Sequence, residues 1–311
     1  MGNLGRGVGM AAAAWLIRHR VSAAVRGWAP GGGSRVQGGP LAVRALGTGS
    51  PATVLLHGIA GGGDAFGAGY DRLADAGRLI IPDVLGFSGS LAPDRDDFSL
   101  AAHLDALDAM ATEMGLDDAP LTVAGHSMGA LLALHWAGRR PDVRRVVTFC
   151  APLYRTAEEA DRHIKAMGWL ESLFALETPL ARRTCAWMCA HRGLAQWLAV
   201  AVSPQYPIPL ARLGALHTWS AYLGGMNAVI RTPSWRGALE LLVERGVPVA
   251  MANGARDPVA VPGLADRLAR ELRTVESYTH PRAGHDLPIS DAAWCADLVT
   301  AADDTPPRHH R

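Results

Sequence analysis

The sequence has almost no excess of charge of either sign: 30 Lys and Arg residues face 29 Asp and Glu residues, for a formal net charge of +1. A chain that gathers nucleic acid or an acidic partner ordinarily carries a strong positive field. We therefore expect no nucleic-acid partner. The balance of charge favours a small ligand that is itself uncharged or weakly charged.

Cysteine is also scarce, with four residues in a chain of 311. A chain this long and this apolar needs no disulfide framework, so we interpret the cysteines as reduced core residues. Cys185 and Cys189 are four residues apart and could place two zinc ligands on one helix face, but no nearby set of His and Cys completes such a site. No metal or other cofactor is expected.

No segment near the N-terminus is long enough to cross a bilayer. The apolar run Met10–Ile17 is too short to span, and charge resumes at Arg18 without a convincing signal-cleavage site. We therefore expect a cytoplasmic protein. Residues 11–28 are interpreted as an amphipathic helix resting on the body. The alternative is a basic helix in weak contact with a membrane surface, anchored by Trp15 and Trp28.

The rest of the chain alternates short apolar runs with segments of helical spacing. Continuous apolar runs are typical of strands buried on both faces of a parallel sheet, and they predict strands at 53–56, 78–81, 121–124, 145–149, 247–251 and 275–279. Helices are predicted at 98–114, with Ser99 or Asp97 as N-cap, and at 128–139. This alternation predicts an α/β fold with helices on both faces of the sheet and ligands at the carboxyl ends of its strands.

The alternation stops between residues 153 and 235, where the sequence is rich in Trp, Met, Leu and Arg. A helical insertion between two strands has to lie above one edge of the sheet, which predicts a lid; ordinary helical core is the alternative. The predicted organisation is an N-terminal helix and flexible linker over 1–40, a core over 41–152 and 236–303, a helical lid over 153–235, and a disordered tail over 304–311.

The strongest local signal is the pentapeptide Gly125-His126-Ser127-Met128-Gly129, which stands directly between a predicted strand and a predicted helix. A strand that turns at once into a helix forces its middle residue into a strained conformation, and the flanking glycines relieve the crowding. Ser127 is then exposed as a nucleophile beside the positive end of the helix dipole. We interpret His126 as a packing residue that supports this turn.

A serine hydroxyl needs a base, and the base needs an acid that fixes its tautomer. We assign His285 as the base because Gly284-His285 follows the last predicted strand; His280, which ends that strand, is the competitor and is interpreted as structural. We assign Asp257 as the acid because it follows the preceding strand. Taken alone, Asp257 before Pro258 would be interpreted as a turn-capping residue.

The segment Leu56-His57-Gly58-Ile59-Ala60-Gly61-Gly62-Gly63 follows the first buried strand, and its glycines allow backbone N–H groups to approach a ligand. We assign the N–H groups of Ile59 and Met128 as the oxyanion hole, with His57 and Gly58 as supporting residues. A phosphate-binding loop is the alternative, but the dinucleotide fingerprint and the Walker lysine are both absent.

Together these motifs resemble the successive landmarks of the α/β-hydrolase superfamily. The resemblance rests on His57-Gly58, Asp83-Val-Leu-Gly86-Phe-Ser-Gly89-Ser90, the Ser127 pentapeptide, Asp257 and Gly284-His285, and it covers residues 41–303. It implies a mostly parallel eight-stranded sheet with a helical lid inserted after the sixth strand. The segment from Asp83 to Ser90 would be a structural loop beside the site.

The same resemblance narrows the reaction without fixing it. Haloalkane dehalogenases and epoxide hydrolases carry Asp where this chain has Ser127, and hormone-sensitive-lipase-like esterases carry a His-Gly-Gly-Gly run that is absent here. Hydroxynitrile lyases, cofactor-free haloperoxidases and ring-cleavage hydrolases keep the serine. We expect hydrolysis of a carboxylic ester of a small hydrophobic substrate through an acyl-enzyme. The alternatives are hydrolysis of a carbon–carbon bond in a ring-cleavage-type diketone and a catalytically silent ligand-binding protein.

Overall fold

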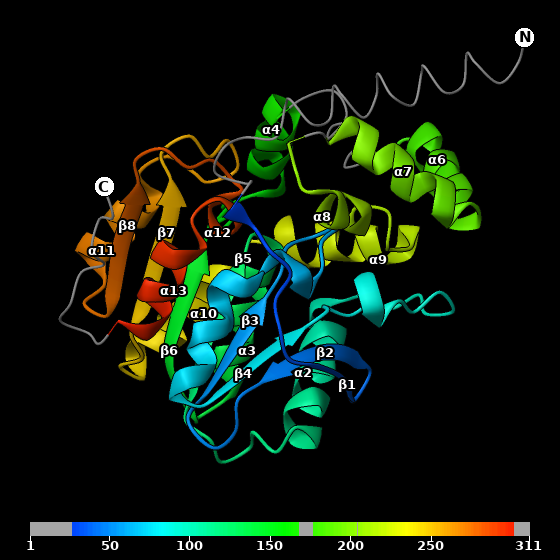
Figure 1. Ribbon diagram of the computed structural model, residues 1–311. Coiled ribbons are helices and arrows are strands. Elements are labelled where there is room, and N and C mark those ends of the chain that lie inside the picture. Colours follow the sequence, from blue (N-terminus) through cyan, green and yellow to red (C-terminus); the bar gives the residue numbers. More distant parts are fainter. Residues whose placement is uncertain (1–26, 168–176, 204, 302–311) are drawn as a thin grey trace, which may run out of the picture.

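A twisted eight-stranded sheet forms the centre of the computed structural model, which describes residues 27–167, 177–203 and 205–301 (Figure 1). The strand order is β1-β2-β4-β3-β5-β6-β7-β8. β1 and β2 pair antiparallel, as do β2 and β4, and the other neighbours are parallel. The strands are β1 (Ser34–Gly38), β2 (Leu41–Leu46), β3 (Ala52–Leu56), β4 (Arg78–Pro82), β5 (Leu121–His126), β6 (Val143–Phe149), β7 (Val249–Gly254) and β8 (Val275–His280). The predicted mostly parallel, eight-stranded α/β fold is confirmed.

Helices cover both faces of the sheet and extend beyond its carboxyl edge (Figure 1). Those associated with the sheet are the 3-10 segments η2 (Gly63–Ala65), η3 (Ala68–Ala76) and η4 (Ser88–Ser90), and the α-helices α2 (Leu100–Glu113), α3 (Met128–Arg139), α10 (Trp235–Glu244), α11 (Leu264–Glu271), α12 (Leu287–Ser290) and α13 (Ala292–Thr300). Those of the segment between β6 and β7 are α4 (Ala157–Met167), α6 (Pro179–Ala190), α7 (Arg192–Val202), α8 (Ile208–Leu213), α9 (Trp219–Gly224) and the π-helix η5 (Gly225–Ile230).

Alternate side chains of each central strand enter separate hydrophobic cores, because successive residues of a strand point to opposite faces. In β3, Val54 packs into a core that also contains residues of α2, α3, α10 and α11. The next residue, Leu55, packs into a second core with residues of η3 and α13. Both faces of the sheet are therefore covered, which explains why its strands are continuously apolar in sequence.

Helix α2 runs from Leu100 to Glu113, slightly shorter than the predicted 98–114, and its N-cap is one of the two predicted residues. The Ser99 Oγ accepts a hydrogen bond of 3.2 Å from the Ala102 N–H at the start of α2, which identifies Ser99 rather than Asp97 as the N-cap. Asp97 instead accepts a hydrogen bond from the Ser99 N–H. Helix α3 begins and ends at the predicted residues.

The sheet differs from the predicted elements chiefly at its antiparallel edge and at the start of β7. β2 is not among the predicted strands, although the folded core is predicted to begin at Leu41. The segment Ser34–Gly38, predicted as part of a flexible linker before residue 41, is the edge strand β1 paired with β2. Its side chains are mostly exposed, so it lacks the apolar pattern that revealed the other strands. β7 begins at Val249 instead of residue 247, because Pro248 has no N–H to donate to the ladder.

The segment predicted as a lid, 153–235, contains helices and no strand in its described part. It follows β6 in the chain, and an isolated bridge between Phe87 and His217 ties it to the loop after β4. Most of the predicted N-terminal helix and the predicted disordered tail lie outside the described residues. Trp28, considered above as a membrane anchor, donates its indole N–H to the Asp64 carbonyl. No helix in the described part of the chain has the length and apolar character needed to cross a membrane.

Candidate active site

Ser127 occupies a strained turn between β5 and α3. Its φ is +54° and its ψ −121°, a conformation that residues with a side chain rarely adopt. The flanking glycines make the turn sterically feasible: a Cβ at Gly125 would lie 2.1 Å from the Gly129 carbonyl oxygen, and one at Gly129 would lie 2.2 Å from the Leu56 carbonyl oxygen. Neither contact is tolerable, so only glycine fits at either position.

The turn places Ser127 at the wall of a pocket of about 290 Å³. His285 and the glycine-rich loop that follows β3 line the same pocket. The remaining wall comes largely from apolar side chains, several of them from the segment between β6 and β7: Ile59, Pro152, Tyr154, Ile164, Tyr206, Leu210, Leu213, Met226, Ile230, Val259 and Ile289. Within residues 27–167, 177–203 and 205–301, no Lys, Arg, Asp or Glu belongs to this lining.

His285 and Asp257 are paired at the adjacent strand ends. Asp257 follows β7 and His285 follows β8, and the His285 Nδ1 lies 3.1 Å and 3.2 Å from the two Asp257 carboxylate oxygens. The Asp257 side chain is completely buried, whereas that of His285 is 25% exposed. With Nδ1 held by the carboxylate, the opposite ring nitrogen, Nε2, is the one left to act as a base.

Asp257 remains an acceptor despite its burial. Burial alone would raise the pKa of Asp257, but the hydrogen bond and charge of His285, the Val259 N–H and the Cys150 thiol together lower the pKa below its ordinary value. The Val259 N–H donates to Asp257 Oδ1 over 2.8 Å, so the turn-capping role considered above and the pairing with His285 coexist.

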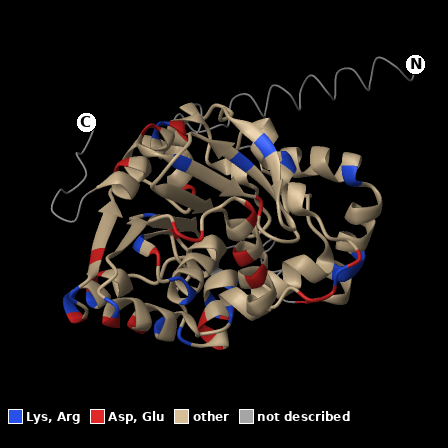
Figure 2. Ribbon diagram, turned by 90° about the horizontal axis from the view of Figure 1, so that it is seen from below, with Lys and Arg blue, Asp and Glu red and all other residues tan. Residues whose placement is uncertain are grey.

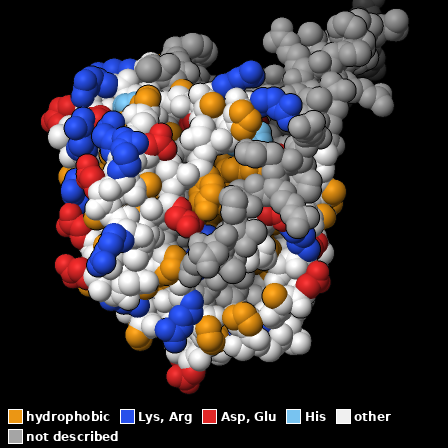
Figure 3. Space-filling model, turned by 90° about the vertical axis from the view of Figure 1, so that its left-hand side faces the viewer, with side chains coloured by type: hydrophobic (Ala, Val, Ile, Leu, Met, Phe, Trp, Pro, Cys, Tyr) orange, Lys and Arg blue, Asp and Glu red, His pale blue; other side chains and the backbone are white. Residues whose placement is uncertain are grey.

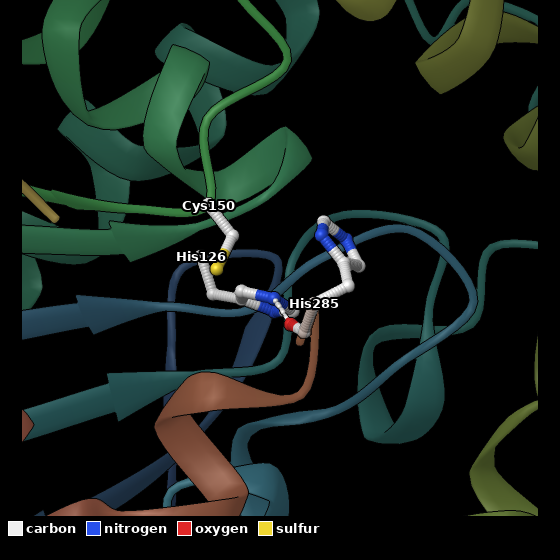
Figure 4. Close-up of side chains that lie close together, drawn as sticks. All are labelled: His126, Cys150 and His285. Atoms are coloured by element: carbon white, nitrogen blue, oxygen red, sulfur yellow. Dashed lines mark hydrogen bonds between the residues drawn. The ribbon is translucent and has the colours of Figure 1, made fainter. Parts of the chain in front are cut away.

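His126 supports the loop that carries His285. Its Nε2 lies 2.8 Å from the His285 carbonyl oxygen, and the two rings have centroids 4.8 Å apart (Figure 4). Burial, followed by the positive charge of a protonated His285, lowers the pKa of His126 to about 3. The imidazole of His126 is therefore neutral at physiological pH and acts as a fixed hydrogen-bonding group beside the nucleophile.

The glycine-rich loop after β3 is fixed by His57. The Val84 N–H donates to His57 Nε2 over 2.8 Å, so the proton of this imidazole resides on Nδ1, which donates to the Gly58 carbonyl over 2.8 Å. In a trans peptide, the N–H of the next residue points opposite to that carbonyl. Fixing the Gly58 carbonyl therefore fixes the direction of the Ile59 N–H.

The surroundings of the Ile59 and Met128 N–H groups are compatible with their assignment as the oxyanion hole. Ile59 lines the pocket, and a Cβ at Gly58 would lie 3.1 Å from the Ser127 Cβ, so the loop runs directly beside the serine. Met128 is the first residue of α3, where backbone N–H groups have no partner within the helix. Asp83, in the segment interpreted as a supporting loop, accepts hydrogen bonds from the N–H groups of Gly63 and Gly89.

Cys150 is a site residue that the sequence analysis missed. It follows β6 with φ +53° and is fully buried, and its Sγ lies 3.7 Å from the Gly284 carbonyl oxygen and within reach of Asp257. Burial, followed by the charge of Asp257, raises the pKa of Cys150. Cys150 therefore contributes a neutral thiol to the environment of the acid. A cysteine at the end of a strand resembles any other core cysteine in sequence.

Cys150, His126 and His285 are also the one group of metal-ligand type found in the described part of the chain, with potential ligand atoms within 4.8 Å of one another (Figure 4). A protonated thiol is a poor ligand, and the His285 Nδ1 is already held by Asp257. We interpret the group as part of the serine site. Cys185 and Cys189 gain no third ligand among the described residues.

His280, the competing base, is held in a structural position. Its Nε2 lies 3.3 Å from Asp291, its Nδ1 accepts the Ala283 N–H, and its ring packs edge-on against Trp294. Both ring nitrogens are thus engaged away from the pocket.

Comparisons with known proteins agree with this architecture. The family model described as "Alpha/beta hydrolase family" matches residues 53–298. A pimeloyl-[acyl-carrier protein] methyl ester esterase of Chromobacterium violaceum is 28% identical over 255 residues, covering 79% of this chain and 91% of that protein. An uncharacterized protein of Mycobacterium tuberculosis is 33% identical over 281 residues, covering 87% and 80%. Among solved structures, a thermophilic esterase from Thermogutta terrifontis aligns with a TM-score of 0.57 at 21% identity, covering 83% of this chain and 91% of that one. The chain belongs to the alpha/beta hydrolase family of enzymes.

Proposed function

We propose that this enzyme hydrolyses a carboxylic ester of a small hydrophobic substrate, with Ser127 as nucleophile, His285 as base and Asp257 as the acid that orients the base. The observation that carries the proposal is the convergence of three strand ends: the strained serine turn after β5 shares one pocket with a histidine that is paired with a buried carboxylate. The similarity to a methyl ester esterase over most of both chains supports the ester as substrate class.

In the proposed reaction, the His285 Nε2 removes the Ser127 hydroxyl proton as the serine oxygen attacks the ester carbonyl carbon. The N–H groups of Ile59 and Met128 stabilise the negative charge that develops on the carbonyl oxygen. The carbon–oxygen bond to the alcohol then breaks, and protonated His285 returns its proton to the departing alcohol. Water, activated by the same imidazole, releases the acid from Ser127.

The pocket lining supports an uncharged, apolar substrate. No Lys, Arg, Asp or Glu of the described part of the chain lines the pocket, and a volume near 290 Å³ holds only a small molecule. Ile164, Leu210 and Met226 reach the pocket from the segment between β6 and β7, which supports a lid function for residues 153–235. Such a lid would exclude bulk water while the acyl-enzyme forms.

A chain-length series of nitrophenyl esters, assayed beside a ring-cleavage dienoate, tests the proposal. We expect turnover of the esters with a preference for short to medium acyl chains, and a drop in kcat of about a millionfold for Ser127→Ala, by analogy with triad proteases. Retention of most activity in Ser127→Ala would contradict the role of the serine. Consumption of the dienoate without turnover of esters would identify carbon–carbon bond hydrolysis instead, and inertness toward both would favour a ligand-binding role.

A further inference from the structure

Helix α7 turns an apolar stripe toward solvent. Leu194, Trp197, Leu198 and Val202 lie at positions i, i+3, i+4 and i+8, so they share one face of the helix, and each is 46–59% exposed. Two other residues of the helix, Ala195 and Val200, are buried, so α7 packs against the protein beside this stripe. A surface helix normally directs its apolar stripe into the protein, so an exposed stripe of this kind indicates a surface that contacts something apolar.

The neighbouring helices extend this apolar surface. α6 and α8 both pack against α7, and they expose Leu180, Trp187 and Ile208 by 40–60%. Nine large apolar residues in the described part of the chain are highly exposed, and seven of them lie on these three helices. The other two are Val36 and Leu241, which lie on β1 and α10. We call the exposed residues of α6, α7 and α8 the cap surface.

The charge of the cap surface has one sign. Residues 178–230 contain four arginines and no Asp, Glu or Lys, although the chain as a whole is nearly neutral. In Figure 2 the helices at the right, where α6 and α7 lie in Figure 1, carry blue segments. In contrast, the face shown in Figure 3 carries basic and acidic side chains intermixed. Among the four arginines, the Arg212 guanidinium lies 5.7 Å from the centre of the Trp197 ring.

We propose that the cap surface docks onto an anionic phospholipid bilayer. The exposed tryptophans and branched aliphatic side chains suit insertion at the boundary between headgroups and acyl chains, and the arginines suit the phosphates above it. An acidic protein partner would need an apolar patch of its own to cover the stripe of four large side chains, whereas an anionic bilayer supplies an apolar layer beneath its phosphates wherever it is contacted. The combination therefore favours lipid over protein.

The cap surface also adjoins the candidate active site. α8 packs against α7 on one side, and its Leu210 and Leu213 line the pocket that contains Ser127. Docking through α7 would therefore bring the wall of this pocket close to the membrane. The docking itself needs no catalysis, so it can be tested on an inactive protein and does not depend on the proposed ester hydrolysis.

The test is cosedimentation of the full chain carrying Ser127→Ala with phospholipid vesicles. We expect binding to vesicles of equal parts phosphatidylcholine and phosphatidylglycerol, weaker binding to phosphatidylcholine alone, and loss of binding at high salt. The double variant Trp197→Ser/Leu198→Ser should reduce partitioning by about tenfold or more. Each of Arg182→Gln and Arg183→Gln should reduce it by about fivefold.

Matched controls separate the cap surface from the rest of the molecule. Leu241→Ser on α10 and Arg267→Gln on α11 remove exposed residues of the same types elsewhere, and they should leave partitioning unchanged; thermal melting confirms that each variant is folded.

The proposal is overturned if anionic vesicles do not bind the protein. It is equally overturned if Trp15→Ser abolishes binding while Trp197→Ser/Leu198→Ser does not. If light scattering shows a dimer that Leu198→Ser breaks, the cap surface binds a second copy of the chain. If the protein captures an acidic acyl-carrier protein and does not bind vesicles, the cap surface binds a protein partner. Either result would contradict the proposal.

Discussion

At the scale of single residues, Asp257 depends on His285 for its ionised state. The carboxylate is completely buried, and the interactions that keep its pKa low come first from that imidazole. The dependence is mutual, because the carboxylate also selects the tautomer of His285 that leaves Nε2 free to accept a proton.

Replacing the acid by its amide tests this dependence. We expect Asp257→Asn to keep the fold but lower kcat by about 10⁴-fold, since an asparagine side chain can favour the wrong tautomer of the base. Steady-state kinetics on a short nitrophenyl ester measures the change. Asp266→Asn is the control, because Asp266 accepts a hydrogen bond from Ser277 on the exposed side of β8 and should matter little for turnover. Equal rates for Asp257→Asn and the unmodified enzyme would exclude Asp257 as the acid.

Residue-level prediction from sequence succeeded or failed according to how local the signal was. Ser127, Asp257 and His285 could be singled out because each follows a recognisable apolar strand, and a parallel sheet brings the carboxyl ends of its strands together. Their catalytic roles stay proposals. Cys150 also follows a strand, but its influence on the acid comes from contacts with Asp257 and Gly284. These contacts are distant in the chain and cannot be predicted from the residues next to Cys150.

At the scale of elements, the close approach of β3, β5 and α3 depends on the absence of side chains at Gly125 and Gly129. A Cβ at Gly129 would meet the Leu56 and His57 carbonyl oxygens at 2.2 Å and 2.5 Å, and both of these atoms belong to backbone that cannot easily move. The first turn of α3 is thereby held close to the end of β3. This close approach brings the serine turn and the loop containing Ile59 to the same pocket.

Two glycine substitutions within α3 should therefore have opposite effects. Gly129→Ala should lower the free energy of unfolding by about 1–3 kcal/mol through overpacking and should also lower kcat by displacing the turn. Gly138→Ala should raise the free energy of unfolding by about 0.5–1 kcal/mol, because its added Cβ would sit 3.5 Å from the Leu241 side chain and a helix favours Ala over Gly. Urea denaturation monitored by circular dichroism measures both. A neutral Gly129→Ala would refute the close packing described here.

Helices and strands could be predicted where their burial requires a recognisable pattern of apolar residues. The central strands and α3 were found because burial on both faces demands uninterrupted apolar residues. β1 was not predicted, because an edge strand with exposed side chains does not require apolar residues. The glycines that precede it also resemble a linker. The helices between β6 and β7 could be recognised as helical, but their exposed apolar faces could be found only once the structure showed which sides are buried.

At the scale of the whole molecule, several buried histidines make stability dependent on pH. Burial lowers the pKa of His103 to about 4 and that of His217 to about 4, and neither ring nitrogen of His103 has a hydrogen-bond partner in the described part of the protein. Between pH 6.5 and 4 the unfolded chain binds a proton at each of these positions while the folded protein does not. Stability therefore falls as the pH drops through this window.

The contribution of His103 can be isolated. Between pH 7 and pH 5, His103 should account for about 2 kcal/mol of the loss in the free energy of unfolding, so His103→Leu should reduce the loss by that amount. Leu241→Ser, at an exposed position without an ionisable group, should leave the loss unchanged. Denaturant unfolding at the two pH values provides the measurement. An undiminished loss in His103→Leu would mean that its imidazole is protonated in the folded protein.

The central claim is that Ser127 is a nucleophile activated by His285, and covalent labelling tests it most directly. A fluorophosphonate should add once to the native protein, with the adduct located on Ser127 by peptide mass spectrometry. His285→Gln should slow the labelling by several orders of magnitude, and Ser127→Ala should abolish it. A native protein that stays unlabelled, or an adduct on another residue that persists in Ser127→Ala, would contradict the account.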